Sequence, residues 1–157
     1  MISQLAPQPL TRWIRPERVV DGLAGSNVEG VLRALAEVLA ADLGDTPPLE
    51  IFARLLERER LGSTGVGRGF AMPHCRLASV AQVHVFVARS ADEVDFAALD
   101  RVPVRVFFAI ATPAGPAGLH LQVLAAIARW LKDEERSRRL LAAFDRETMV
   151  ALLSEVV

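Results

Sequence analysis

The sequence predicts an α/β domain in which helices pack on a mixed β-sheet. Two observations carry this prediction. Residues 83–88 and 102–110 are apolar runs rich in valine and phenylalanine, and their length and composition are typical of buried strands. Amphipathic helical patterns precede and follow this central region. The chain has 157 residues and shows no internal repeat or linker, so we expect a single domain over residues 1–157.

The first two helices are expected before the strands. Ser26-Asn27-Val28-Glu29 has the spacing of a capping box, and Gly44 ends the helix that follows. The apolar residues on one face of this helix are Val28, Val31, Leu32, Leu35, Val38 and Leu39. Thr46-Pro47-Pro48 opens a second helix, because proline is tolerated in the first turn. This helix stops at Gly62. Its apolar stripe is Ile51, Phe52, Leu55 and Leu56.

Three further helices are expected after the strands. The first is long and begins near Leu119 or His120. Its predicted apolar stripe is Leu121, Leu124, Ala125, Ala128 and Leu131. Two shorter helices, over residues 135–144 and 146–156, complete the chain, and Asp145 is placed as the N-cap of the second.

Composition and charge exclude several classes of function. The 18 basic and 19 acidic residues nearly cancel, which removes the sequence-wide argument for binding nucleic acid or an anionic membrane. No apolar run reaches the roughly 18 residues that a membrane span needs, so no stable membrane insertion is expected. Residues 1–16 lack the apolar stretch of a signal peptide. The single cysteine, Cys75, fits a reducing compartment, and we expect a cytoplasmic protein.

A glycine-rich loop at residues 62–69 first suggests nucleotide binding. Gly62 and Gly67 have the spacing of half a P-loop, but Arg68-Gly69 stands where Lys-Ser/Thr is required. The dinucleotide fingerprint also fails, because Phe70 occupies the position of its last glycine. Two interpretations remain. The loop amides and the hydroxyls of the residues after Gly62 can cradle an anion, or the glycines only allow the chain to reverse direction.

Histidines are the other candidates for chemistry. His74 follows a proline that fixes its backbone, and neutral imidazole is a nucleophile that can carry a phosphoryl group. His120 lies at a predicted helix N-terminus, where anions are favoured. His84 lies inside a predicted apolar strand, and this position favours a packed side chain over a functional one. The spacing of these residues gives no zinc site. A hydrolase with Cys75 as nucleophile and His120 as base is a further alternative.

Two blocks of sequence resemble a known family. Residues 58–74, RERLGSTGVGRGFAMPH, resemble the signature of enzyme IIA of the bacterial phosphotransferase system, fructose/mannitol family. Residues 106–113, VFFAIATP, and the later HLQVL at residues 120–124 resemble the second block of that family. The resemblance covers a core of about residues 13–156, leaving residues 1–12 as an N-terminal extension. A separate chain with this signature looks most like the nitrogen-regulatory branch of the family.

The resemblance implies a three-layer sandwich, with a mixed sheet flanked by helices on both faces. It also implies a phosphohistidine carrier, a phosphotransferase component more than a free-standing enzyme. The phospho-accepting histidine of the family falls on His74, through Nε2, and its second histidine and its arginine fall on His120 and Arg58. The side chains of His120 and Arg58 can bind the oxygens of a phosphoryl group on His74. The predicted phosphate cradle is completed by Ser63, Thr64 and Gly65.

The resemblance further implies the partners of the protein. The phosphoryl donor would be a histidine phosphocarrier of the HPr/NPr type, and no nucleotide, metal or other cofactor is needed for transfer between histidines. Regulation of partners through the phosphorylation state is the expected purpose, although the sequence does not identify the targets. A sugar-specific IIA serving a separate transporter is one alternative, and a binding module that no longer cycles phosphate is another. Cys75 departs from the glycine that the family usually has.

Overall fold

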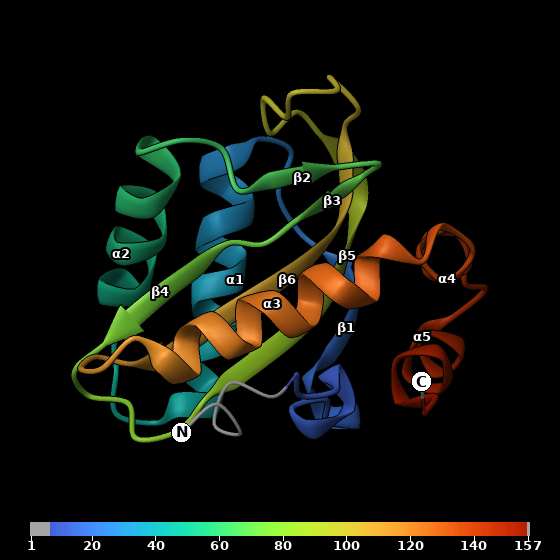
Figure 1. Ribbon diagram of the computed structural model, residues 1–157. Helices are drawn as coiled ribbons and strands as arrows, with labels where there is room; N and C mark the ends of the chain where they lie inside the picture. The colour runs from blue at the N-terminus through green and yellow to red at the C-terminus, as the bar shows by residue number, and fades with distance from the viewer. Residues whose placement is uncertain (1–6, 157) are drawn as a thin grey trace.

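The computed structural model describes residues 7–156 and has three layers (Figure 1). A six-stranded mixed sheet has the order β1-β5-β6-β3-β2, and β4 pairs with β6 beyond β3. The strands are β1 (Val19–Leu23), β2 (Gly65–Gly67), β3 (Phe70–Ala71), β4 (His74–Leu77), β5 (His84–Val94) and β6 (Val104–Pro113). The helices are α1 (Val28–Leu43), α2 (Pro48–Arg60), α3 (Gly118–Lys132), α4 (Glu134–Leu141) and α5 (Arg146–Ser154).

Two apolar cores lie on opposite faces of the sheet. One core joins the sheet to α1 and α2, and the other joins it to α3, α4 and α5. Alternate residues of β6 divide between them: Phe108 belongs to the core beneath α3, and Phe107 to the core beneath α1 and α2. This alternation follows from the two-residue period of a strand. The α/β class and the helices on both faces are therefore as the sequence predicted.

The two long strands begin one or two residues later than predicted and extend further at their C-terminal ends, and three short strands were not predicted. The run at residues 83–88 continues to Val94 in β5, and the run at residues 102–110 continues to Pro113 in β6. The missed strands β1, β2 and β4 have five residues or fewer. Segments this short show too few periods of alternation to be recognised, and they exist because β3, β5 and β6 supply pairing partners.

β3 and β4 are two parts of one interrupted strand. Both run parallel to β6, and their register is the same, since Phe70 lies opposite Val106 and His74 lies opposite Ile110. Pro73 stands between the two parts and has no N–H to give to a ladder, although its carbonyl accepts a hydrogen bond from Ile110 N at 3.0 Å. The interruption makes His74 the first residue of β4.

The structure corrects one predicted helix cap and confirms two other predicted helix boundaries. The predicted capping box from Ser26 is wrong by one residue: Asn27 is the N-cap of α1, and its side-chain oxygen accepts the Gly30 N–H at 2.8 Å. Asn is at least as good a cap as Ser. Gly44 ends α1 with a φ of 81°, as expected from its sequence position. The start of α2 at Pro48 also confirms the prediction.

The predicted apolar stripe of α3 is largely wrong. Leu121 is 59% exposed, and Ala125 and Ala128 also face solvent. The buried residues are His120, Val123, Ala126, Ile127, Trp130 and Leu131. Both sets recur at steps of three and four, but Val123, Ile127 and Trp130 lie on the side of the helix that packs into the core on this face of the sheet. The helix itself begins at Gly118, close to the expected start.

The last two helices are shorter than expected. α4 covers Glu134–Leu141, with Asp133 as its N-cap, so Phe144 lies outside it and is 92% exposed. α5 ends at Ser154 rather than at residue 156. The predicted cap of α5 is confirmed, because the Asp145 carboxylate accepts the Thr148 N–H at 2.8 Å.

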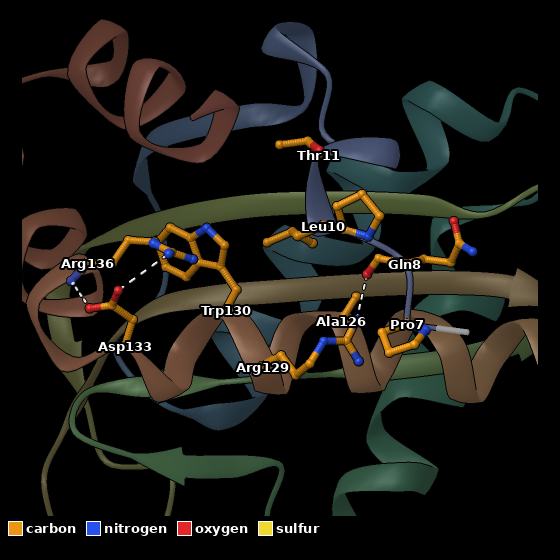
Figure 2. A pocket seen from close by; sticks show the side chains of 10 residues that line it. Pro7, Gln8, Leu10, Thr11, Ala126, Arg129, Trp130, Asp133 and Arg136 are labelled. Atoms are coloured by element: carbon orange, nitrogen blue, oxygen red, sulfur yellow. Dashed lines mark hydrogen bonds and ion pairs between the residues drawn. The ribbon is translucent and has the colours of Figure 1, made fainter. Parts of the chain in front are cut away.

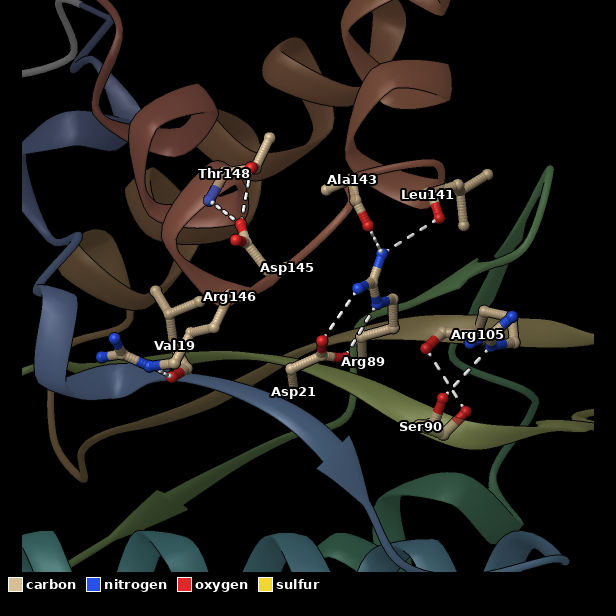
Figure 3. Close-up of polar contacts among 10 residues, drawn as sticks. All are labelled: Val19, Asp21, Arg89, Ser90, Arg105, Leu141, Ala143, Asp145, Arg146 and Thr148. Atoms are coloured by element: carbon tan, nitrogen blue, oxygen red, sulfur yellow. Dashed lines mark hydrogen bonds and ion pairs between the residues drawn. The ribbon is translucent and has the colours of Figure 1, made fainter.

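A buried arginine fastens these C-terminal helices to the sheet (Figure 3). Arg89 of β5 forms a two-point ion pair with Asp21 of β1, with both N···O distances at 2.9 Å. Its remaining nitrogen donates to the carbonyls of Leu141, at the end of α4, and Ala143, in the connection to α5. One guanidinium thus joins three segments. Within residues 7–156, none of the helices is both long enough and apolar enough to cross a membrane.

Candidate functional site

A cavity of about 280 Å³ opens where the end of α2, the start of β4 and the first turn of α3 meet. Figure 1 shows β4 running past α2 toward the start of α3. The cavity is lined by Arg54, Glu57, Arg58, Leu61, His74, Cys75, Arg76 and His120. The fold therefore brings three predicted site residues together, His74, His120 and Arg58, from three separate elements.

Hydrogen bonds fix both nitrogens of His74. Its Nδ1 lies 2.8 Å from the Met72 carbonyl oxygen, which can only accept, so Nδ1 carries the proton. Its Nε2 lies 3.1 Å from Nε of Arg58, whose N–H can only donate. Nε2 therefore has a lone pair that faces a cation. This tautomer makes Nε2 the nucleophilic nitrogen of the ring.

Arg58 is held in place by the end of its own helix. While its Nε donates to His74, its Nη1 donates to the Gly62 carbonyl at 2.8 Å. Gly62 lies just past the end of α2, and a cation is favoured beside the C-terminus of a helix. The hydrogen bond from Arg58 to Gly62 thus fixes the end of α2, and it also directs the guanidinium toward the imidazole of His74.

His120 approaches His74 from α3. The two ring centroids are 5.3 Å apart with a tilt of 55°. Nδ1 of His120 shares a hydrogen bond of 2.6 Å with the hydroxyl of Thr112, a fully buried residue of β6. The pKa of His120 is lowered to about 4, mainly by burial and in smaller part by the neighbouring His74 and Arg76. The imidazole is consequently neutral at physiological pH.

The pKa of His74 is also lowered from its usual value. The main cause is burial, and the nearby Arg58 cation acts in the same direction. The hydrogen bond to Met72 and the carboxylate of Glu59 oppose the shift. Because a neutral imidazole keeps its Nε2 lone pair, the environment holds His74 in the form that can act as a nucleophile.

The predicted phosphate cradle does not line this cavity. The Thr64 hydroxyl and backbone N–H both donate to the Glu59 carboxylate, at 2.5 and 2.9 Å. The Ser63 hydroxyl donates to the Phe96 carbonyl and accepts the Gly65 N–H. These groups therefore stabilise the loop after α2. Sequence analysis missed Glu59, although its place beside Arg58 at the end of a helix was a usable signal.

Cys75 borders the cavity, but its side chain projects from the face of β4 opposite to that of His74. It is 5% exposed and belongs to the apolar core beneath α1 and α2. This burial raises the pKa of the thiol to about 12. A nucleophilic cysteine needs an accessible thiolate, so the geometry disfavours the hydrolase alternative with His120 as base. Among residues 7–156, no group of three or more His, Cys, Asp or Glu side chains is placed to hold a metal ion.

Another cavity, of about 520 Å³, lies between the N-terminal segment and the end of α3 (Figure 2). Its charged side chains already have partners: Arg129 donates to the Gln8 carbonyl, and Arg136 pairs with Asp133. Arg136 also stacks on the ring of Trp130, with 5.3 Å from Cζ to the ring centroid. These contacts fasten the N-terminal segment and α4 to α3.

Comparison with known proteins agrees with the fold, that of an α/β protein of the phosphotransferase-system IIA class. The chain belongs to the family described as phosphoenolpyruvate-dependent sugar phosphotransferase system, EIIA 2, whose model matches residues 13–156. Residues 1–6 of the expected N-terminal extension lie outside the residues that the structure describes.

Relatives of this chain carry two kinds of name. A nitrogen regulatory protein of Bradyrhizobium diazoefficiens is 34% identical over 93% of this chain and 95% of its own length. A fructose-specific EIIA component of Haloferax volcanii is 38% identical over 82% of this chain and 84% of its own. Among solved structures, the nitrogen regulatory protein IIA-Ntr of Neisseria meningitidis superposes with a TM-score of 0.82, at 29% identity, over 92% of this chain and 98% of its own.

Proposed function

We propose that this protein is a phosphohistidine carrier that accepts a phosphoryl group on Nε2 of His74. The observation that carries the proposal is the pair of hydrogen bonds on that ring. Nδ1 is committed to the Met72 carbonyl, and the Nε2 lone pair is directed to the cation of Arg58. The proposed donor is a histidine phosphocarrier of the HPr/NPr type, the kind of protein that supplies IIA domains of this family.

The transfer step exchanges one P–N bond for another. The Nε2 lone pair of His74 attacks phosphorus in line, a P–N bond forms, and the P–N bond to the carrier imidazole breaks. The electron pair of the broken bond returns to the carrier nitrogen. No proton has to move at His74, because Nδ1–H keeps its bond to the Met72 carbonyl and so supports the positive charge that the ring gains.

Two neighbours are placed to bind the phosphoryl oxygens. Arg58 can turn its Nε–H from His74 to an oxygen and form a charge-assisted hydrogen bond. His120 can donate from Nε2 when the Thr112 hydroxyl donates to its Nδ1, and the low pKa of His120 means that it does so as a neutral ring.

We further propose that the phosphorylation state regulates partner proteins. A phosphoryl group adds a charge of about −1.5 to −2 at the mouth of a cavity whose charged residues are mostly arginines, and this cancels most of the positive charge that a partner would meet. The nitrogen-regulatory names of several relatives support this role.

Two alternatives have specific tests. The fructose-specific name of one relative favours a sugar-specific IIA that serves a separate transporter, and deletion of the gene would then impair growth on a single sugar. A binding module that has stopped cycling phosphate would bind its partners equally well before and after the substitution His74→Ala, under every phosphorylation condition.

The deciding experiment is intact mass measurement after incubation with phosphoenolpyruvate, enzyme I and a histidine phosphocarrier. We expect one added phosphate that is stable in mild base and lost in acid. His74→Ala should remain folded and gain no phosphate. His84→Gln, which changes a histidine that does not line the cavity, should gain one. Absence of phosphate on the wild type beside a phosphorylated carrier, or its persistence in His74→Ala, would refute the proposal.

A further inference from the structure

Arg76 has an unsatisfied donor beside the paired histidines. It stands two residues after His74 on β4, so both side chains project from the same face of the strand. The side chain lines the cavity. Its Nε–H is shielded from solvent and has no acceptor among residues 7–156. A buried donor without an acceptor costs free energy, and an incoming anion would remove that cost.

The other end of the same guanidinium is anchored. Nη2 of Arg76 donates to the carbonyl of Gly115, in the loop that leads into α3. The charge lies near His120, since Arg76 is one of the causes that lower the pKa of that ring. The contact with Gly115 thus holds the guanidinium on the His120 side of the cavity while Nε remains available.

The charges of the cavity separate into one pair and two unmatched cations. Arg54 and Glu57 lie on successive turns of α2 and pair with each other at 4.0 Å. Glu57 is the one carboxylate among the lining residues. Arg58 and Arg76 remain, and their two positive charges match the charge of about −1.5 to −2 on a phosphoryl group.

We propose that Arg76 is a second phosphoryl-binding residue, which contacts the group on His74 through its free Nε–H. This inference rests on the proposed function, the phosphorylation of His74. Arg58 binds the phosphoryl group from α2 and Arg76 binds it from β4, so the two guanidiniums act from different elements. Because the anchor on Gly115 fixes Arg76 in advance, little side-chain freedom is lost when the phosphoryl group arrives.

The first test is the equilibrium of phosphoryl transfer between the phosphorylated carrier and this protein. A hydrogen bond between charged groups is worth enough that we expect Arg76→Gln to lower the equilibrium constant roughly tenfold to a hundredfold. Arg76→Lys, which keeps the charge, should recover part of the loss. Arg138→Gln removes an exposed arginine that pairs with Glu135 on α4 and should leave the constant unchanged.

A second measurement needs no variant. Arginine Nε–H resonances of the ¹⁵N-labelled wild type are recorded before and after phosphorylation. We expect the Arg76 and Arg58 signals to move, as those of new hydrogen bonds to oxygen do, while the signal of Arg89 stays in place. An equilibrium constant of folded Arg76→Gln equal to that of the wild type, or an unmoved Arg76 signal in phosphorylated protein, would overturn the inference. A wild type that takes up no phosphate would instead overturn the proposed function.

Discussion

Nε of Arg58 donates to Nε2 of His74 across 3.1 Å. The cation therefore occupies the lone pair that would attack phosphorus in the proposed mechanism. Since the Met72 carbonyl accepts from the other ring nitrogen, the imidazole ring cannot flip without losing both hydrogen bonds. Arg58 thus sets the orientation of the ring before transfer, and it must then move from the ring nitrogen to the phosphoryl oxygens.

The first prediction concerns Arg58→Gln. The rate of phosphoryl transfer should fall about a hundredfold or more, because one charged donor to the transferred group is lost. The pKa of His74 should rise, since the Arg58 cation helps to lower it. Rapid-quench kinetics and an NMR titration of the ring measure the two effects. Arg58→Lys should restore the rate only in part, because an ammonium lacks the planar fork. An unchanged rate together with an unchanged His74 pKa would contradict the role.

The second prediction concerns pH and His120. Its pKa is about 4 in the folded protein and about 6.5 in an unfolded chain. Between these values the unfolded imidazole binds a proton that the folded one does not, so this residue lowers the stability as the pH falls from 6.5 toward 4. At pH 5 the cost is about 1 kcal/mol after allowance for solvent screening.

Urea unfolding at pH 7.5 and pH 5 measures this effect. The wild type should lose more stability between the two values than His120→Gln, whose amide does not titrate and can still bond to Thr112. The difference between the two losses isolates His120 from the other titrating groups. Equal losses in the two proteins would show that His120 titrates normally in the folded state.

The elements that sequence analysis missed are those whose structure depends on distant partners. β1 and β4 are short and exist because β5 and β6 pair with them. The stripe of α3 was misplaced because several leucines and alanines also recur at helical spacing, and only contact with the sheet selects Val123 and Ile127 over Leu121 and Ala128. Local signals did better: the cap at Asp145 and the stop at Gly44 depend on neighbouring atoms alone.

The candidate site also combines residues that the sequence could predict with contacts that it could not. His74, His120 and Arg58 could be named from a family signature, and the fold brings them to one cavity. The sequence did not show that the Thr64 hydroxyl faces Glu59, because a glycine-rich loop can direct its hydroxyls to either side. Nor could it show the free donor of Arg76, which depends on how an interrupted strand lies against the loop before α3.

The third prediction concerns the ion pair of Arg89. Arg89→Met leaves the Asp21 carboxylate and the carbonyls of Leu141 and Ala143 without their shared donor. We expect the free energy of unfolding to fall by about 2–3 kcal/mol at pH 7, measured by urea denaturation. Arg138→Met removes an exposed pair and should change it by less than about 0.5 kcal/mol. If the two substitutions cost the same, the buried pair does not fasten the C-terminal helices as described.

The last prediction concerns Cys75, which stands where the family usually has glycine. Its thiol is buried and has a pKa of about 12, so almost no thiolate is present at pH 8. A thiol reagent such as iodoacetamide should label the native protein only as fast as it unfolds, and should label it at once in urea. Cys75→Ala should accept phosphate as the wild type does, and mild peroxide treatment should leave both proteins active. Loss of phosphate uptake in peroxide-treated wild type but not in Cys75→Ala would mean that the thiol reaches the face of His74, and the strand would then have to open there during the phosphorylation cycle.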